Sequence, residues 1–139
     1  MHFELHEQLA KDTEIAGDFP LSRVCVMNDE NFPWVILVPR VPNVREIYEL
    51  QAMEQQQLLQ ESSRLGMWLM REFNGDKLNI GALGNMVPQL HVHHIVRFES
   101  DPAWPAPVWG KCAANPYSSD AIEQFAGKLR AQLKLRSIA

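Results

Sequence analysis

The chain has 139 residues, 46% of them hydrophobic, and a formal net charge of −4. This length and composition predict a single domain over residues 1–139 with a core of its own. The charges are spread along the chain, which gives no basic patch for duplex nucleic acid or a membrane surface, and no apolar run is long enough to span a bilayer. We therefore expect no nucleic-acid or membrane partner and, because the N-terminus is not of signal-peptide type, a cytoplasmic protein.

The first 40 residues predict a short helix followed by a hairpin. Apolar residues recur at helical spacing in FELHEQLAKD (residues 3–12), and AGDFPLSR (residues 16–23) is a Gly-Pro turn. Two β-rich runs follow, LSRVCVMND (residues 21–29) and WVILVPR (residues 34–40), with a polar turn between them. We expect these two runs to pair as an antiparallel hairpin.

The central part of the chain predicts one long amphipathic helix. Asn43 is the expected N-cap, and Glu46 three residues later makes a pair like a capping box. Asn74-Gly75 is the expected stop. The apolar periodicity between these signals predicts about 25 to 30 helical residues.

The last third predicts two more strands and a final helix. KLNIGALGN (residues 77–85) is a strand followed by a glycine-rich turn, and QLHVHHIVRF (residues 89–98) is a second strand. A loop rich in Pro and Trp comes next, and we expect it to be ordered. It either folds across the histidine strand or a partner subunit, or lies on the surface with its two tryptophans in grooves. The final helix begins after Ser118 or Ser119. Strands joined by turns, with helices packed on one face, predict an α+β domain around an antiparallel sheet.

Three of the five histidines stand in the strand PQLHVHHIVRF. Side chains alternate between the two faces of a strand, so Gln89, His91 and His93 share one face. His94 points to the other face, which is expected to meet the core. A row of two imidazoles and an amide can contact one anionic group from several sides.

Three interpretations of this row compete. The histidines could be plain exposed strand residues, or an H-x-H pair of metal ligands, although a zinc site needs at least a third protein ligand. The third interpretation is phosphoryl or nucleotidyl chemistry, because a neutral imidazole is a nucleophile near pH 7. A neighbouring protonated histidine could then bind phosphate oxygens and donate a proton to the leaving group. The glycine-rich turn NIGALGN just before the strand lets backbone N–H groups approach an anion, which favours this third interpretation without a metal or cofactor.

The stretch QLHVHHI resembles the His-φ-His-φ-His-φ-φ signature of the histidine triad (HIT) family, where φ is apolar. WVILVPR and GNMVPQLHVHHI extend the resemblance over residues 21–98, and FPWVILVPR with DPAWPAPVWG resembles a bacterial branch of the family. The resemblance implies an α+β fold with an antiparallel sheet of about five strands, a long helix and a C-terminal helix. It also implies a homodimer that hydrolyses or transfers nucleotides at the α-phosphate.

The resemblance also assigns roles to individual positions. His91 matches the nucleophile, and His93 matches the histidine that contacts the phosphoryl oxygens. Asn85 matches a phosphate contact and Asn79 a residue that positions the phosphate or the nucleophile. Asn28 lies near the ribose-binding residue. For the base we expect an apolar pocket, with four candidate lining residues: Phe32, Trp34, Ile36 and Leu37.

Two positions depart from the family pattern. Gln89 stands where the first histidine is expected, and glutamine forms hydrogen bonds but does not titrate. It could orient a group but not relay a proton. His94 occupies an apolar position, where we expect it to be covered by core or dimer contacts. A nucleotide-binding module with little or no turnover is therefore the alternative to an enzyme, and a metal-dependent hydrolase is a second one.

Overall fold

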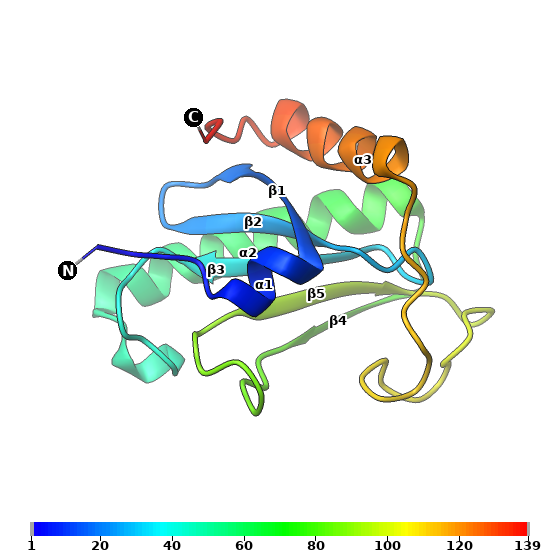
Figure 1. The fold of residues 1–139 in the computed structure, drawn as a ribbon, viewed down its shortest axis with the longest axis horizontal. Helices are drawn as coiled ribbons and strands as arrows, with labels where there is room; N and C mark the ends of the chain where they lie inside the picture. Colours follow the sequence, from blue (N-terminus) through cyan, green and yellow to red (C-terminus); the bar gives the residue numbers. More distant parts are fainter. Residues whose placement is uncertain (1, 139) are drawn as a thin grey trace.

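The computed structural model describes residues 2–138, which form one antiparallel sheet with helices on both faces (Figure 1). In chain order the elements are α1 (Glu7–Asp12), β1 (Thr13–Asp18), β2 (Ser22–Met27), β3 (Trp34–Pro39), the 3-10 turn η1 (Ile47–Glu49), α2 (Ala52–Phe73), β4 (Lys77–Gly81), β5 (Val92–Arg97) and α3 (Ser119–Gln132). The strand order is β1-β2-β3-β5-β4. The predicted α+β architecture around a five-stranded antiparallel sheet is confirmed.

Strand β5, which carries His93 and His94, lies between β3 and β4. His93 is paired with Ile36 of β3 on one side and with Gly81 of β4 on the other. The predicted hairpin of β2 and β3 is also confirmed, with Cys25 opposite Ile36. Because β5 has a hydrogen-bonded neighbour on each side, its backbone direction, and with it the direction of each histidine, is held by the sheet.

Each face of the sheet has its own apolar cluster. On one face, α2 and α3 bury Leu65, Leu69 and Leu129 against the sheet. On the other face, Leu9 of α1 and Val108 of the loop after β5 complete the second cluster. Figure 1 shows α1 in front of the sheet and α2 behind it. Helices therefore cover both faces, rather than the one face expected, and all residues of β3 and β5 are buried.

Strand β1 was not predicted, because its residues resemble a turn. Gly17 has a φ of 153°, which favours glycine, and the register shifts between Ile15 and Gly17. Asp18 pairs with Arg23 and Arg40, so a residue that favours turns is held in a strand by two cations. The turn expected over residues 16–23 is limited to the few residues between β1 and β2.

The first helix is shorter than the expected span of residues 3–12. It begins at Glu7, because Nδ1 of His6 accepts a hydrogen bond from the N–H of Gln8 and caps it. Phe3 and Leu5 lie outside the helix and pack against the apolar cluster on the α1 side of the sheet. Residues 3–6 therefore form an N-terminal segment of their own.

The long helix also begins later than expected. Asn43 has a φ of 59°, in the left-handed region, so it does not start a helix. The carboxylate of Glu49 instead accepts hydrogen bonds from the N–H groups of Arg45 and Glu46, which supports the separate turn η1. The helix α2 then has 22 residues and ends at Phe73, and the left-handed conformation of the C-cap Asn74 confirms the predicted stop. The final helix is confirmed as well, with Ser118 as its cap.

The loop after β5 is ordered, as expected, and Asp101 is its anchor. Its carboxylate accepts hydrogen bonds from the Arg97 guanidinium and from the N–H groups of Phe98, Ala103 and Trp104. Burial would raise the pKa of Asp101, but these donors outweigh it and lower the pKa to about 2. This anchoring returns the loop to the sheet, where the ring of Trp109 lies 5.3 Å from that of His93 between centroids.

His94 lies in the core between the sheet and α2, as its apolar sequence position predicts. The side chain is fully buried, with Ser62 Oγ 2.7 Å from Nε2 and the Val92 carbonyl oxygen 3.1 Å from Nδ1. A carbonyl only accepts, so Nδ1 carries the hydrogen and the Ser62 hydroxyl donates to Nε2. Burial lowers the pKa of His94 to about 4, and the imidazole is neutral in the folded protein at neutral pH.

This burial predicts a loss of stability in mild acid. As the pH falls below 6.5, the unfolded chain binds a proton at residue 94 that the folded protein does not bind until about pH 4. Between about pH 7.5 and 5, His94 should therefore lower the free energy of unfolding by roughly 2 kcal/mol. The Ser62→Ala/His94→Val double variant removes both polar partners together. Its free energy of unfolding, measured with urea at the two pH values, should lack this part of the decrease.

The exposed His2 offers a matched control. The His2→Gln variant should show the same decrease in unfolding free energy between the two pH values as the parent protein. An equal decrease in the Ser62→Ala/His94→Val variant would show that residue 94 does not contribute.

Candidate active site

His91 and His93 face each other on the side of the sheet opposite to His94. Their ring centroids lie 5.0 Å apart, and His93 also packs against Trp34 at 5.7 Å. His94 instead contacts Ser62 of α2. The predicted alternation of the histidines is confirmed, but the strand is shorter than the expected span of residues 89–98. It begins at Val92, so Gln89 and His91 lie just before it. The two site histidines are only 7% and 5% exposed, so the row lies beneath other groups rather than on an open strand face.

The orientation of His91 is fixed by the backbone of its own segment. Its Nδ1 lies 2.6 Å from the carbonyl oxygen of Gln89. Because a carbonyl oxygen only accepts, the hydrogen of the neutral imidazole is on Nδ1. The lone pair is then on Nε2, which is the arrangement that a nucleophilic histidine needs.

His93 has the opposite tautomer. The indole N–H of Trp34 donates to Nδ1 of His93 at 2.9 Å, so the hydrogen of the neutral ring is on Nε2. Burial, followed by the nearby His91 and His94, lowers the pKa of His93 to about 3. His93 is therefore an uncharged hydrogen-bond donor at neutral pH. The expected protonated neighbour, able to give a proton to a leaving group, is not present at this position.

The four residues expected to line a base pocket lie in the core instead. Phe32, Trp34 and Ile36 belong to the apolar cluster on the histidine face, and Leu37 belongs to the cluster on the α2 face. Trp34, Ile36 and Leu37 are buried because β3 is a central strand that is covered on both sides, and Phe32 lies just before this strand. Of the four, Trp34 has a contact with the site, through its hydrogen bond to His93.

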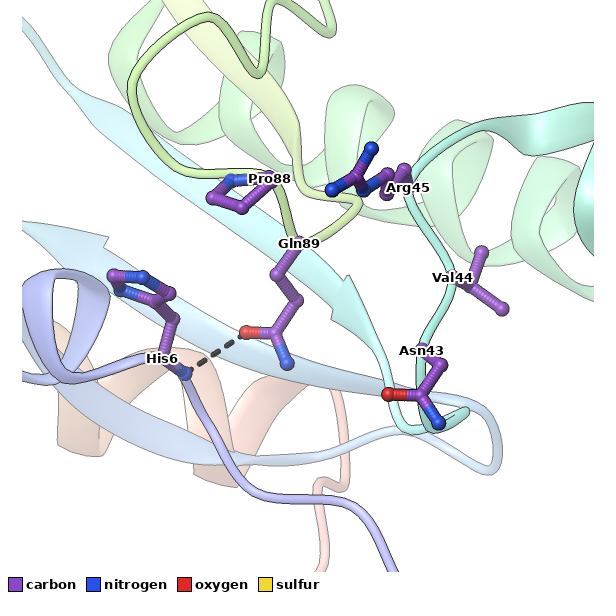
Figure 2. Close-up of a pocket in the computed structure, with 6 residues that line it drawn as sticks. All are labelled: His6, Asn43, Val44, Arg45, Pro88 and Gln89. Carbon is purple, nitrogen blue, oxygen red and sulfur yellow. Dashed lines mark hydrogen bonds between the residues drawn. The ribbon is translucent and has the colours of Figure 1, made fainter.

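Gln89 attaches the N-terminal segment to the histidine row. Its Oε1 accepts a hydrogen bond from the N–H of His6 at 2.9 Å, shown in Figure 2. Its Nε2 donates to the carbonyl oxygen of Glu4 at 2.8 Å. The side chain at the first position of the row is thus bonded to backbone that lies more than 80 residues away in the sequence. No local sequence signal marks such a pairing.

Asn28 is not brought to His91. Strand register places Cys25 level with His93, and Asn28 lies three residues further along β2, whereas His91 lies two residues in the other direction. Five residues along a strand correspond to roughly 16 Å. The Oδ1 of Asn28 accepts a hydrogen bond from the N–H of Tyr117 and so holds the segment before α3.

The other two predicted contacts have different surroundings. Asn79 is paired with Ile95 across β4 and β5, and its Oδ1 accepts a hydrogen bond from Arg97 at 2.8 Å. Asn85 is exposed in the glycine-rich turn, and its side chain has no hydrogen bond to another described residue. The turn itself lies at the site, because Gly84, with a φ of 73°, lines a small cavity together with His91.

A larger cavity of about 440 Å³ adjoins this small one. It is lined by His6, Asn43, Val44, Arg45, Pro88 and Gln89 (Figure 2). Arg45 and Gln89 line both cavities, so the larger one lies next to the space at His91. Sequence reasoning missed His6 and Arg45, because each reaches the site from a separate segment.

No metal centre or membrane-crossing helix is found in the part of the chain that the structure describes. Among residues 2–138, no group of three His, Cys, Asp or Glu side chains is arranged to hold a metal ion. Within the same residues, no helix has the length and apolarity needed to cross a bilayer.

Comparisons with known proteins agree with the fold. Three histidine triad proteins of known structure are similar over nearly the whole chain. The protein from Marinobacter aquaeolei VT8 is 54% identical, with a TM-score of 0.93 over 96% of this chain and 98% of that one. The protein blr8122 from Bradyrhizobium japonicum is 46% identical, with a TM-score of 0.91 over 94% and 98% of the two chains. The protein SMc02904 from Sinorhizobium meliloti 1021 is 40% identical, with a TM-score of 0.90 over 93% and 96%.

No curated protein matches the chain. The HIT domain family model, however, matches residues 8–100, a span that includes the whole sheet, α2 and both site histidines. Since this match covers more than half of the sequence, and the similar structures share fold and length with it, the chain belongs to the HIT domain family.

Proposed function

We propose that the protein is a nucleotide hydrolase or nucleotidyl transferase that acts at the α-phosphate of a nucleotide derivative. The reaction proceeds through a covalent nucleotidyl-histidine at His91. The hydrogen bond between Nδ1 of His91 and the Gln89 carbonyl is the observation that carries this proposal, because it leaves the lone pair on Nε2. Membership of the HIT family supports the same class of chemistry.

The first step forms one bond and breaks one. The Nε2 lone pair of His91 attacks the α-phosphorus, and the bond from phosphorus to the leaving group breaks, with its electron pair going to the leaving group. The Nε2–H of His93 donates a hydrogen bond to a phosphoryl oxygen, where negative charge develops. The glycine-rich turn, whose Gly84 lines the cavity at His91, offers further donors through its N–H groups, and Asn85 of the same turn is the expected phosphate contact.

The second step releases the nucleotide. A water oxygen attacks phosphorus, the P–N bond breaks, and its electron pair returns to Nε2 of His91. The water proton passes to solvent, and the product is a nucleoside monophosphate. If another nucleophile takes the place of water, the same intermediate leads to nucleotidyl transfer.

A nucleotide-binding module with little turnover is the second candidate. It is favoured by the low exposure of His91 and His93 and by the small size of the cavity at His91. Such a module binds the nucleotide without forming the covalent intermediate. Detection of that intermediate therefore separates the two candidates.

The His91→Ala variant should not form the covalent intermediate. After mixing with an adenylate ester, intact mass and 31P NMR should show one nucleotidyl group on the parent protein and none on His91→Ala. Nucleotide binding should change by less than about tenfold, because the phosphate donors remain. His94→Val is the matched control, since residue 94 faces α2, and it should still be labelled. Labelling of His91→Ala together with loss of labelling in His94→Val would assign the nucleophile to His94 instead of His91.

The hydrogen bond from Trp34 gives a second prediction. His93→Ala should lower the rate of labelling by about 10²- to 10⁴-fold, since a positioned donor at the phosphoryl oxygens is lost. Trp34→Phe keeps an aromatic ring but removes the N–H that fixes the His93 tautomer, so it should lower the rate by a smaller factor with little change in nucleotide affinity. Single-turnover kinetics measures both effects. A rate in His93→Ala equal to that of the parent would exclude His93 from the reaction.

The protein is also proposed to be a homodimer, joined through the surface of α2 and β4. Strand β4 is at the edge of the sheet, and its Ile80 is 53% exposed. Ile80 lines an apolar groove of about 590 Å³ together with Leu58, Leu59 and Val92. An open strand edge beside an apolar groove is a surface that a second copy of the chain can cover through a two-fold axis.

Charge placed in this groove should separate the subunits. The Leu59→Glu/Ile80→Glu variant should be a monomer at micromolar concentration by light scattering, because dimer formation would bury both carboxylates. Ile138→Glu also adds a charge at an exposed apolar residue but lies outside the groove, so it should remain a dimer. If the unsubstituted protein is already a monomer under these conditions, the dimer proposal fails.

A further inference from the structure

Trp109 lies against the histidine row, although it has no part in the proposed reaction. It belongs to the loop after β5, and its ring centroid lies 5.3 Å from that of His93 and 6.4 Å from that of Trp34. The centroids of Trp34 and His93 lie 5.7 Å apart. The His93 ring therefore packs against two indoles, one from β3 and one from the loop.

A glycine of β4 leaves open the space that Trp109 occupies. Gly81 is the residue opposite His93 in the β4–β5 ladder, and residues paired in this way direct their side chains to the same face of the sheet. A Cβ atom added at Gly81 would lie 3.2 Å from Cη2 of Trp109. A side chain larger than a methyl group at position 81 would therefore move the indole away from its place beside His93.

The path of the loop, and not a hydrogen bond of the indole, sets the position of Trp109. Asp101 fixes the start of the loop through Arg97 and through backbone N–H groups, and Val108 is buried in the apolar cluster on the same face. The indole N–H of Trp109 is shielded from solvent and has no hydrogen-bond partner among residues 2–138. A buried indole N–H usually has a partner, and one without it is unfavourable, so the ring contacts must compensate.

These ring contacts restrict the motion of His93. The Trp34 N–H donates to Nδ1 of His93 at 2.9 Å, which places the hydrogen on Nε2. Without the second indole, the His93 ring could rotate about its Cβ–Cγ bond, and water could reach both ring nitrogens and compete with Trp34. The Nε2–H would then lose its fixed direction. A donor displaced by about 1 Å loses much of its effect on a transition state.

We propose that Trp109 is a positioning residue of the site, which holds the His93 ring against Trp34 and keeps the Nε2–H directed at the phosphoryl group. This inference rests on the proposed function, because Trp109 acts through the donor role of His93 and not on the substrate. It makes the loop rich in Pro and Trp a part of the active site rather than a cover over the core.

The first measurement follows His93 in the protein without substrate. In 1H–15N spectra of the imidazole nitrogens, the parent protein should show one His93 tautomer, with the hydrogen on Nε2, and a Trp34 indole N–H that exchanges slowly with solvent. Trp109→Ala should show both tautomers, and the Trp34 indole N–H should exchange at least about tenfold faster. Trp109→Phe keeps an aromatic ring and lacks the unpaired N–H, so it should resemble the parent protein.

The second measurement is the single-turnover rate of labelling at His91. Trp109→Ala should lower this rate by about 10- to 100-fold with less than about a threefold change in nucleotide affinity, because a donor is misplaced and not removed. Trp109→Phe should react within about threefold of the parent rate. In the His93→Ala background, adding Trp109→Ala should change the rate by less than about threefold, since no ring remains to be positioned.

Two further variants separate positioning from stability. Trp68→Ala removes a tryptophan that packs against the apolar cluster on the α2 face, so it should lower the free energy of unfolding but leave the labelling rate and the His93 tautomer unchanged. Gly81→Ala tests the contact without removing the indole, and it serves if Trp109→Ala does not fold. The added methyl group displaces the Trp109 ring slightly, which should lower the labelling rate by about three- to tenfold.

The outcomes distinguish the inference from the proposed function. If the parent protein is not labelled at His91, the proposed function fails. If it is labelled and Trp109→Ala reacts at the parent rate, Trp109 is not a positioning residue and the function stands. The inference is also overturned if the rate losses of His93→Ala and Trp109→Ala multiply in the double variant, or if Trp68→Ala slows labelling as much as Trp109→Ala does. Loss of the rate in Trp109→Phe would assign the effect to the indole N–H instead of the ring.

Discussion

The burial of β5 on both faces is the constraint on which the rest of the site depends. A central strand covered from both sides leaves its polar side chains little water, so each histidine needs a protein partner. His91 has the Gln89 carbonyl, His93 has the Trp34 indole, and His94 has Ser62 of α2. These partners fix the tautomer of each neutral ring: the hydrogen is on Nδ1 in His91 and His94, and on Nε2 in His93. The differences among the three histidines in hydrogen-bond partner and tautomer therefore follow from this packing.

The neutral state of His93 has the largest consequence for chemistry. Enclosure by Trp34 and Trp109 and the proximity of His91 keep the ring uncharged, with its pKa lowered to about 3. A donor in a site from which water is largely excluded stabilises developing charge without moving its own proton. In the proposed reaction, the rate then depends on the nucleophile His91 and on the stability of the leaving group.

Two distant segments complete the surroundings of the row. The N-terminal segment is held by Gln89, and the loop after β5 is held by Asp101, which brings Trp109 onto His93. Each attachment depends on hydrogen bonds to backbone groups, so it fixes the path of the chain and not only one side chain. A glutamine side chain suits the attachment at position 89. An amide both donates and accepts, and so it satisfies an N–H and a carbonyl at once.

The sequence by itself determined the features that depend on local periodicity and termination signals. The alternation of His91 and His93 against His94, the β2–β3 hairpin, the end of α2 at Asn74 and the cap of α3 follow from neighbouring residues alone. Tertiary structure decided the rest. Strand β1 exists because β2 pairs with it and two arginines hold Asp18, and Trp34 meets His93 from 59 residues away. The cavity at Arg45 forms where three separate segments meet, and a contact made only after the chain has folded leaves no mark in the local sequence pattern.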